Sequence, residues 1–402
     1  MDEAPHPRLV VHHRLSPHHS EPLAGPRAGG RLPVEREAAA AAAAPAGGVV
    51  VRSRPMSRRP RRRQGGQGAF VPLPPPAPPH APGELRQDPL GGGWVAITAG
   101  RAARPEAFLV DEGPVRGPLG CPFCQGNEHL TPPEVWADRE PGSGPDRPGW
   151  RVRVVPNKFP AFAGQAVAAP ERNGGLYRAA PTAGLHEVVV HNPDHTATLA
   201  DLPQPAVAGV VAAWRQRLAA HADGPFGAVM VIVNQGRTAG ASLEHPHSQV
   251  FATAGRPERV AAELDRLAGD GCAACAMVAA ERDGPRVVER AGGLLTVCPW
   301  ASSVPFEGLL LPARHQARLQ DGDAALAAAL HGLLGRLRGA AGARAPYNLV
   351  LHTAPPGVDD FHWHLHLLPR LTTFGGFELG TGIVINVVDP DHAAAALRAA
   401  PG

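Results

Sequence analysis

Cysteines and histidines carry the most recognisable chemistry in this sequence of 402 residues. Two Cys-x-x-Cys pairs occur, and each is followed, in the same order, by a single histidine and then by a histidine cluster. Two thiolates and two imidazoles suit a tetrahedral zinc ion, and four such ligands leave no open coordination position. The pattern therefore predicts two structural zinc sites, one formed by Cys121, Cys124, His195 and His245 and the other by Cys272, Cys275, His315 and His362.

The last ligand of the second set stays open at this stage. His362, His364 and His366 alternate with other residues and compete for one coordination position. Glu263 and His352 could also support a different metal arrangement in this part of the chain.

A second chemical signal is a Gly- and Ala-rich turn, Asn234-Gln-Gly-Arg-Thr-Ala-Gly-Ala-Ser242, that follows a Val- and Ile-rich strand. Backbone N–H groups in such a turn can face a phosphate with no Cβ in the way. On the next strand, His245, His247 and Gln249 alternate and should point to one face.

His247 is the candidate nucleophile of this face. A neutral imidazole can attack phosphorus when its other nitrogen is tied to an acceptor, and Gln249 can donate an uncharged hydrogen bond to a phosphoryl oxygen. In the alternative interpretation, His247 is a structural residue that supports the metal site.

The elements that must position these residues are strands rich in Val and Ile and a few amphipathic helices. Antiparallel strands with few helices indicate an α+β fold. We expect helices at 204–221, 257–268 and 324–337, and strands at 94–98, 151–155, 187–191, 228–234, 249–253, 294–297, 308–311, 347–352 and 362–368.

Residues 1–85 differ from the rest in composition. They hold an Ala run, a Pro-rich run and 12 arginines against 6 acidic residues, which predicts a disordered basic extension, or residues upstream of the true translation start. The remainder has no basic bias toward nucleic acid. No apolar run is long enough to span a membrane and the N-terminus lacks a secretory signal, so we expect a cytoplasmic protein.

Together these motifs resemble the galactose-1-phosphate uridylyltransferases of the histidine-triad superfamily, over roughly residues 84–400. The matching stretches are Asp88-Pro-Leu, Trp94-Val, Arg101-Ala-Ala-Arg104-Pro, Cys121-Pro-Phe-Cys124, Asn157-Lys-Phe-Pro, Pro193-Asp-His195, Asn234-Gln-Gly, Ser242 to Gln249, Pro305-Phe-Glu and Gly376-Phe-Glu. The resemblance implies two histidine-triad-like units with a mainly antiparallel sheet, an N-terminal catalytic unit at 86–255 and a C-terminal unit at 256–400.

The resemblance also implies a ping-pong reaction. His247 would take UMP from UDP-glucose and pass it to galactose 1-phosphate, with Gln249 assisting. The residues implied in substrate binding are Arg101, Arg104, Asn157, Asn234, Ser242 and Glu378. From their spacing alone, the two arginines could equally be a solvated pair.

Three further expectations follow from the resemblance. Members of the family commonly form homodimers, so we expect one here. The Cys pair and Gly380-Thr-Gly in the second half also resemble plant-type ADP-glucose phosphorylases, which makes an ADP-sugar phosphorylase the first alternative. A non-catalytic, zinc-bound nucleotide-binding module is the second. His364 occupies the place of His247 but has no glycine turn before it, so we expect it to be inactive.

Overall fold

A computed structural model of the chain describes residues 83–99, 101, 117–165, 176, 179–319 and 323–402. These residues fall within one compact unit that spans Gly65–Gly402. In the part of the chain that the model describes, no helix is long and apolar enough to cross a membrane.

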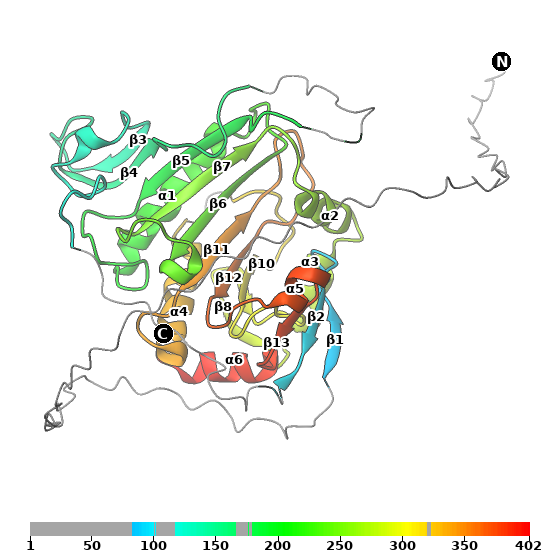
Figure 1. Cartoon of the computed structure of the whole chain (residues 1–402). Helices are drawn as coiled ribbons and strands as arrows, with labels where there is room; N and C mark the ends of the chain where they lie inside the picture. Colours follow the sequence, from blue (N-terminus) through cyan, green and yellow to red (C-terminus); the bar gives the residue numbers. More distant parts are fainter. Residues whose placement is uncertain (1–82, 100, 102–116, 166–175, 177–178, 320–322) are drawn as a thin grey trace, which may run out of the picture. The chain divides into compact units, whose positions relative to one another are not determined.

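A ten-stranded sheet in which all neighbouring strands are antiparallel forms the centre of this unit (Figure 1). Its strand order is β3-β4-β5-β7-β6-β11-β12-β10-β9-β8. The strands are β3 (Trp136–Arg139), β4 (Trp150–Pro156), β5 (Gly184–Val190), β6 (Ala228–Gln235), β7 (His247–Thr253), β8 (Val287–Ala291), β9 (Leu294–Val297), β10 (Gly308–Pro312), β11 (Tyr347–His352) and β12 (His364–Pro369).

The order of the strands repeats on the two sides of the junction between β6 and β11. From that junction outward it runs β6, β7, β5, β4 on one side and β11, β12, β10, β9 on the other. Each set comes from one of the two segments that carry a Cys-x-x-Cys pair. The sheet is nevertheless continuous, because β6 and β11 pair antiparallel with Asn348 opposite Asn234. The boundaries 86–255 and 256–400 for two units stay a prediction.

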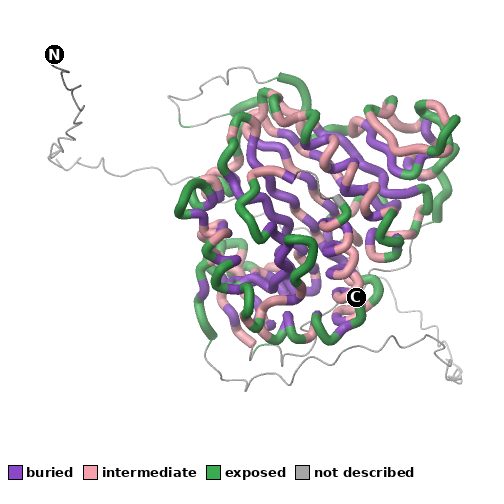
Figure 2. Tube along the Cα trace, turned by 180° about the vertical axis from the view of Figure 1, so that it is seen from behind, coloured by how far each residue is buried: buried purple, intermediate pink, exposed green. Residues whose placement is uncertain are grey.

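One face of the sheet is apolar and is covered by three helices, α1 (Gln204–Ala220), α4 (Asp323–Ala341) and α6 (Pro390–Ala399). Alternate strand residues such as Val231, Val250 and Leu365 point into this core, and all three are nearly inaccessible to solvent. The buried strand interiors are visible in Figure 2. The residues between them, including His247 and His364, point to the opposite face, because neighbouring side chains of a strand alternate.

That opposite face is covered in the second half by α2 (Glu258–Leu267) and α3 (Ala273–Glu281), which pack on β9 and β10. A separate three-stranded sheet has the order β1-β2-β13, with β1 (Glu84–Gln87), β2 (Trp94–Ile97) and β13 (Val384–Asn386). The short helix α5 (Gly376–Thr381) lies next to β13. The α+β class predicted from the sequence is therefore confirmed.

Most predicted elements are present, with shifted ends. The strand expected at 362–368 begins at His364, because His362 leaves the ladder to approach Cys272 and Cys275. The strand expected at 187–191 begins earlier, at Gly184. Seven helices and strands of the described residues were not predicted from the sequence, namely β1, β3, β8, β13, α3, α5 and α6. The extension at 1–85 lies almost wholly outside the described residues.

Candidate active site

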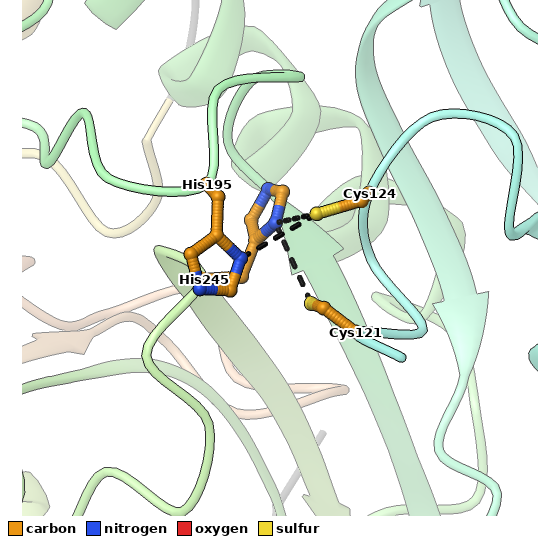
Figure 3. A group of neighbouring side chains, drawn as sticks. All are labelled: Cys121, Cys124, His195 and His245. Carbon is orange, nitrogen blue, oxygen red and sulfur yellow. Dashed lines mark hydrogen bonds between the residues drawn. The ribbon is translucent and has the colours of Figure 1, made fainter. Parts of the chain in front are cut away.

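The first Cys/His group comes together as the sequence predicts (Figure 3). The Sγ atom of Cys124 lies 3.4 Å from Nδ1 of His195 and 3.5 Å from Nδ1 of His245, and Cys121 Sγ lies 3.7 Å from the latter. All four ligand atoms lie within 4.8 Å of one another. A tetrahedral zinc ion with ordinary bond lengths places sulfur and nitrogen ligands about 3.5 Å apart. The donor set and its spacing therefore fit zinc.

The surroundings of this group also suit a metal ion. The Nε2–H of His245 donates to the carbonyl oxygen of Asn192 at 2.9 Å, which leaves the lone pair on Nδ1 facing the sulfurs. Burial lowers the pKa of His245 to about 4, so this imidazole is neutral. Burial and the neighbouring Cys121 raise the pKa of Cys124 to about 11. Thiolate ligation therefore requires a cation that displaces the protons.

The second group repeats the first. Cys275 Sγ lies 3.4 Å from Nδ1 of His315 and 3.5 Å from Nδ1 of His362, and Nε2–H of His362 donates to the carbonyl oxygen of Pro312 at 2.9 Å. The chain thus brings His362, rather than its two neighbours, to the cysteine pair.

A third group, Glu263, His352 and His364, also has ligand atoms within 4.8 Å of one another. The Nδ1–H of His352 donates to Glu263 at 2.6 Å, and the rings of His352 and His364 stack with centroids 4.9 Å apart. All three groups are compatible with a bound metal ion. The described residues therefore offer three candidate metal sites, one more than the sequence predicts.

His247 stands at the start of β7 with its ring on the polar face of the sheet. Its Nδ1–H donates to the carbonyl oxygen of His245 at 2.8 Å, so the lone pair resides on Nε2. Burial lowers the pKa of His247, which keeps the ring neutral. The ring of Phe123, from between the first two cysteines, packs against it with centroids 5.2 Å apart. The loop with the cysteines therefore helps to fix the imidazole.

The Gly-rich turn lies directly before this strand. Gly236 and Gly240 have φ of 88° and 90°, a region that residues with a Cβ rarely adopt. The turn and His247 border a cavity of about 280 Å³ whose other wall includes Arg338 and Tyr347. Ser242 lies exposed in the turn. A small anionic group can reach the turn from this cavity.

Two carboxamides flank His247 on the same face. Asn234 is the second-last residue of β6, and its Oδ1 accepts a hydrogen bond of 2.8 Å from Nδ2 of Asn348, which also donates to the carbonyl oxygen of Ala239. Gln249 follows two residues after His247, and its Oε1 lies 2.7 Å from Nε2 of His186. Asn157 joins this cluster through Nδ2, which lies 3.0 Å from the same nitrogen of His186.

His186 and Asn348 are site residues that the sequence reading did not identify. Each lies on a strand whose partner at the site is far away in the sequence. The available signal was alternation: extending the strand expected at 187–191 back to Gly184 places His186, Val188 and Val190 on one face, opposite Phe251, Gln249 and His247.

Three predicted substrate-binding residues are not brought to His247 by the described contacts. Arg101 follows β2 of the small sheet and is exposed. Glu378 lies in α5 next to that same sheet, where its carboxylate accepts a hydrogen bond from the Gly375 N–H at 2.9 Å. Arg104 lies outside the described residues.

The site thus combines a neutral histidine, a turn with two glycines of positive φ and a cavity, on an antiparallel sheet whose strand order repeats. Residues 84–257 match the family described as galactose-1-phosphate uridyl transferase, N-terminal domain. The chain is 31% identical over 329 residues to ADP-glucose phosphorylase of Arabidopsis thaliana, covering 78% of this chain and 92% of that protein. It is 25% identical over 337 residues to galactose-1-phosphate uridylyltransferase of Thermotoga maritima, covering 78% and 98%.

Solved structures agree with these relatives. The crystal structure of the Arabidopsis thaliana ADP-glucose phosphorylase with bound ADP-glucose superimposes with a TM-score of 0.65 at 30% identity, covering 79% of this chain and 99% of that one. A uridylyltransferase structure gives a TM-score of 0.59 at 29% identity, covering 79% and 97%. The chain belongs to the galactose-1-phosphate uridylyltransferase family and is a nucleotidyltransferase.

Proposed function

We propose that the protein transfers a nucleoside monophosphate from a nucleoside diphosphate hexose to an acceptor phosphate, with His247 as the covalent carrier. The observation that carries the proposal is the hydrogen bond from His247 Nδ1–H to the carbonyl oxygen of His245 at 2.8 Å. It holds the lone pair on Nε2, which a nucleophile needs, and a structural metal at His245 alone would not require it. The turn with two glycines of positive φ and the cavity that border His247 argue against a non-catalytic zinc-bound module.

The first step forms a bond between Nε2 of His247 and the α-phosphorus. The bond from that phosphorus to the bridging oxygen breaks, and hexose 1-phosphate leaves with the electron pair. In the second step a phosphate oxygen of the acceptor attacks the same phosphorus. The bond between that phosphorus and Nε2 breaks, and its electron pair returns to Nε2, which regenerates the neutral imidazole. The protein supplies position and charge stabilisation, through donors such as Gln249, Asn234 and the turn. Ser242 and Asn157 would contribute further donors.

Zinc in the two Cys/His groups would be structural, because each group supplies four protein ligands and leaves no coordination position open. Its contribution in the first half would be to fix the segment that carries Phe123 against His247. Arg101, Arg104 and Glu378 keep their proposed roles in binding phosphate and sugar, and we expect a homodimer.

Two substrate pairs suit this chemistry. The first is UDP-glucose with galactose 1-phosphate as acceptor, as most of the relatives' names suggest. The second is ADP-glucose with inorganic phosphate. It is favoured by the identity of 31% to the Arabidopsis thaliana ADP-glucose phosphorylase, against 25% to the Thermotoga maritima uridylyltransferase.

The intact mass of the protein after brief mixing with UDP-glucose, and separately with ADP-glucose, tests the proposal. Without an acceptor, a UMP or AMP adduct should accumulate and map to His247, and H247A should bind metal normally but form none. The base that gives the faster adduct identifies the donor. Galactose 1-phosphate or inorganic phosphate then identifies the acceptor by discharging it. Turnover by H247A at the wild-type rate would refute the mechanism.

A further inference from the structure

His186 is a buried histidine that touches the active site without being part of the nucleotidyl-transfer chemistry described above. It lies on β5 and is 8% exposed. Its ring stacks on Phe251 with centroids 3.9 Å apart. Its two nitrogens face the main-chain N–H of Ala161 and the carboxamide of Gln249, at 3.2 and 2.7 Å.

The position of the imidazole proton follows from these two contacts. The N–H of Ala161 can only donate, so Nδ1 of His186 must present its lone pair. A neutral imidazole has one proton, which therefore resides on Nε2 and is donated to Oε1 of Gln249. An imidazolium would carry a second proton on Nδ1, which would point at the N–H of Ala161. Burial also lowers the pKa of His186, so both effects favour the neutral ring.

This hydrogen bond fixes the carboxamide of Gln249. With its oxygen occupied by His186, the amide cannot rotate by half a turn without placing its NH2 group against the Nε2–H. The NH2 group is thus left to donate on the face where His247 stands, two residues earlier on β7. A rotated amide would present lone pairs to a phosphoryl oxygen, which also carries lone pairs.

Asn157 has a related arrangement. Its Oδ1 accepts from the N–H of Phe159 at 2.9 Å, which fixes its NH2 group 3.0 Å from Nε2 of His186. Because that nitrogen carries the proton, it offers no lone pair to Asn157. Asn157 is half-buried, so its NH2 group remains available to a ligand.

The same principle operates on the other side of His247. Asn348 donates from its NH2 group to the carbonyl oxygen of Ala239, which fixes the orientation of its carboxamide. The same NH2 group donates to Oδ1 of Asn234. This contact uses the oxygen of Asn234 and does not involve its NH2 group. A main-chain group thus orients a carboxamide on each side of His247. The N–H of Ala161 orients Gln249 through His186, and the carbonyl oxygen of Ala239 orients Asn234 through Asn348.

We propose that His186 is a positioning residue, which orients Gln249 so that its NH2 group binds the α-phosphoryl oxygens during transfer to His247. This inference rests on the proposed function. Removing one donor to a developing charge slows catalysis about 10²–10³-fold in a well-studied hydrolase. Loss of orientation alone should cost less, since Gln249 can still adopt the productive rotamer, and we expect roughly a 10- to 50-fold slower reaction.

The test is the single-turnover rate of adduct formation at His247, measured by intact mass with the nucleotide sugar that reacts faster. H186F keeps the aromatic stack on Phe251 and removes the donor, so it should react 10- to 50-fold more slowly than wild type, on the scale argued above. H186Q can still donate from its terminal NH2 group to Gln249, and its rate should return to within a few-fold of wild type. H186N retains an acceptor for Ala161 but is too short to reach Gln249, and it should behave like H186F.

Coupling to Gln249 separates positioning from a general structural effect. The double variant H186F/Q249A should react no more slowly than Q249A alone, because His186 acts through that carboxamide. The matched control is H221F, a His-to-Phe change at the opposite face of β5, where His221 contacts Glu187. It should form the adduct at the wild-type rate.

The possible failures are distinguishable. If wild-type protein forms no adduct with either nucleotide sugar, the proposed function fails. If wild type forms the adduct and H186F or H186N matches its rate, the positioning role is overturned. It is also overturned if H186F and Q249A slow the reaction additively. Should H186F fail to fold, as judged by its metal content and melting temperature, H186N and H186Q decide the question.

Discussion

Behind the active site, a buried ion pair joins β5 to α1 and permits a quantitative prediction. Arg217 of α1 donates through Nε and Nη2 to the two carboxylate oxygens of Glu187, at 2.8 and 2.6 Å, and the two residues are 8% and 3% exposed. In R217M the carboxylate keeps only His221, at 3.4 Å. Breaking a buried pair in this way costs about 3–5 kcal/mol. At roughly 2 °C per kcal/mol for a unit of this size, the melting temperature should fall by about 6–10 °C.

The pH dependence of this cost has a defined sign. Burial by itself raises the pKa of Glu187, but hydrogen bonds from His221 and Arg217 outweigh it and lower the pKa. The wild-type contribution is therefore present above the unfolded pKa of about 4.3 and is lost as pH falls through the lower folded value. In R217M burial dominates and the pKa of Glu187 rises. The cost of the substitution should be greatest at neutral pH and should shrink near pH 4.5, where the carboxylate gains a proton.

Urea unfolding of wild type, R217M, E187Q and the double variant, at pH 7.5 and near pH 4.5, measures both effects. The double variant should recover much of the loss, because it leaves no unpaired buried charge. R338M is the matched control, since Arg338 pairs with Asp201 at 3.0 Å but the two side chains are 39% and 41% exposed, and its cost should stay below about 1 kcal/mol. A cost for R217M below about 1 kcal/mol, or one independent of pH, would refute the reasoning.

Three further predictions concern the site. C124S should lose the metal of the first group and slow adduct formation, because Phe123 is no longer fixed against His247. Zinc content and intact mass measure the two effects. Wild-type zinc content together with a wild-type rate of adduct formation would contradict a structural metal. S248A should cost about 1–3 kcal/mol in urea unfolding, because it leaves the buried indole N–H of Trp214 without the acceptor that it has at 2.7 Å. H364N should still form the adduct on His247, and an adduct mapped to His364 in wild type would overturn the inactive assignment.

The sequence was most informative where chemistry depends on residue type and order. The two Cys-x-x-Cys pairs, with their histidines, have ordered spacings that few other functions require, and the fold brings each set together. The central strands were predictable because they are short, nearly continuous apolar runs, such as Ala228–Val233 in β6 and Leu349–Leu351 in β11. Edge elements were missed for physical reasons. β3 (Trp136–Arg139) has no apolar alternation, and its Arg139 and Asp138 form ion pairs with Glu134 and Arg151 instead.

The hydrogen-bond partners of the site could not be predicted in the same way. His186 meets Gln249 only because Val188 pairs with Gln249 on the neighbouring strand, which places the two side chains on one face. Asn348 meets Asn234 across the junction of the two halves, 114 positions apart in the sequence. Such contacts depend on which distant strands pair and in which register. Alternation within one strand shows which residues share a face, but it does not identify the partner strand.

The two histidines at equivalent places in the duplicated sheet show how one geometry can serve two purposes. His247 and His364 make the same Nδ1 hydrogen bond to the carbonyl oxygen two residues earlier, at 2.8 and 3.0 Å. They differ in what faces Nε2. His247 adjoins a turn with two glycines of positive φ and a cavity, whereas His364 is fully buried and its ring stacks on His352. A phosphate can therefore approach only the first. The tautomer needed for attack comes from the shared fold, and access for a substrate comes from the glycine turn that the second half lacks.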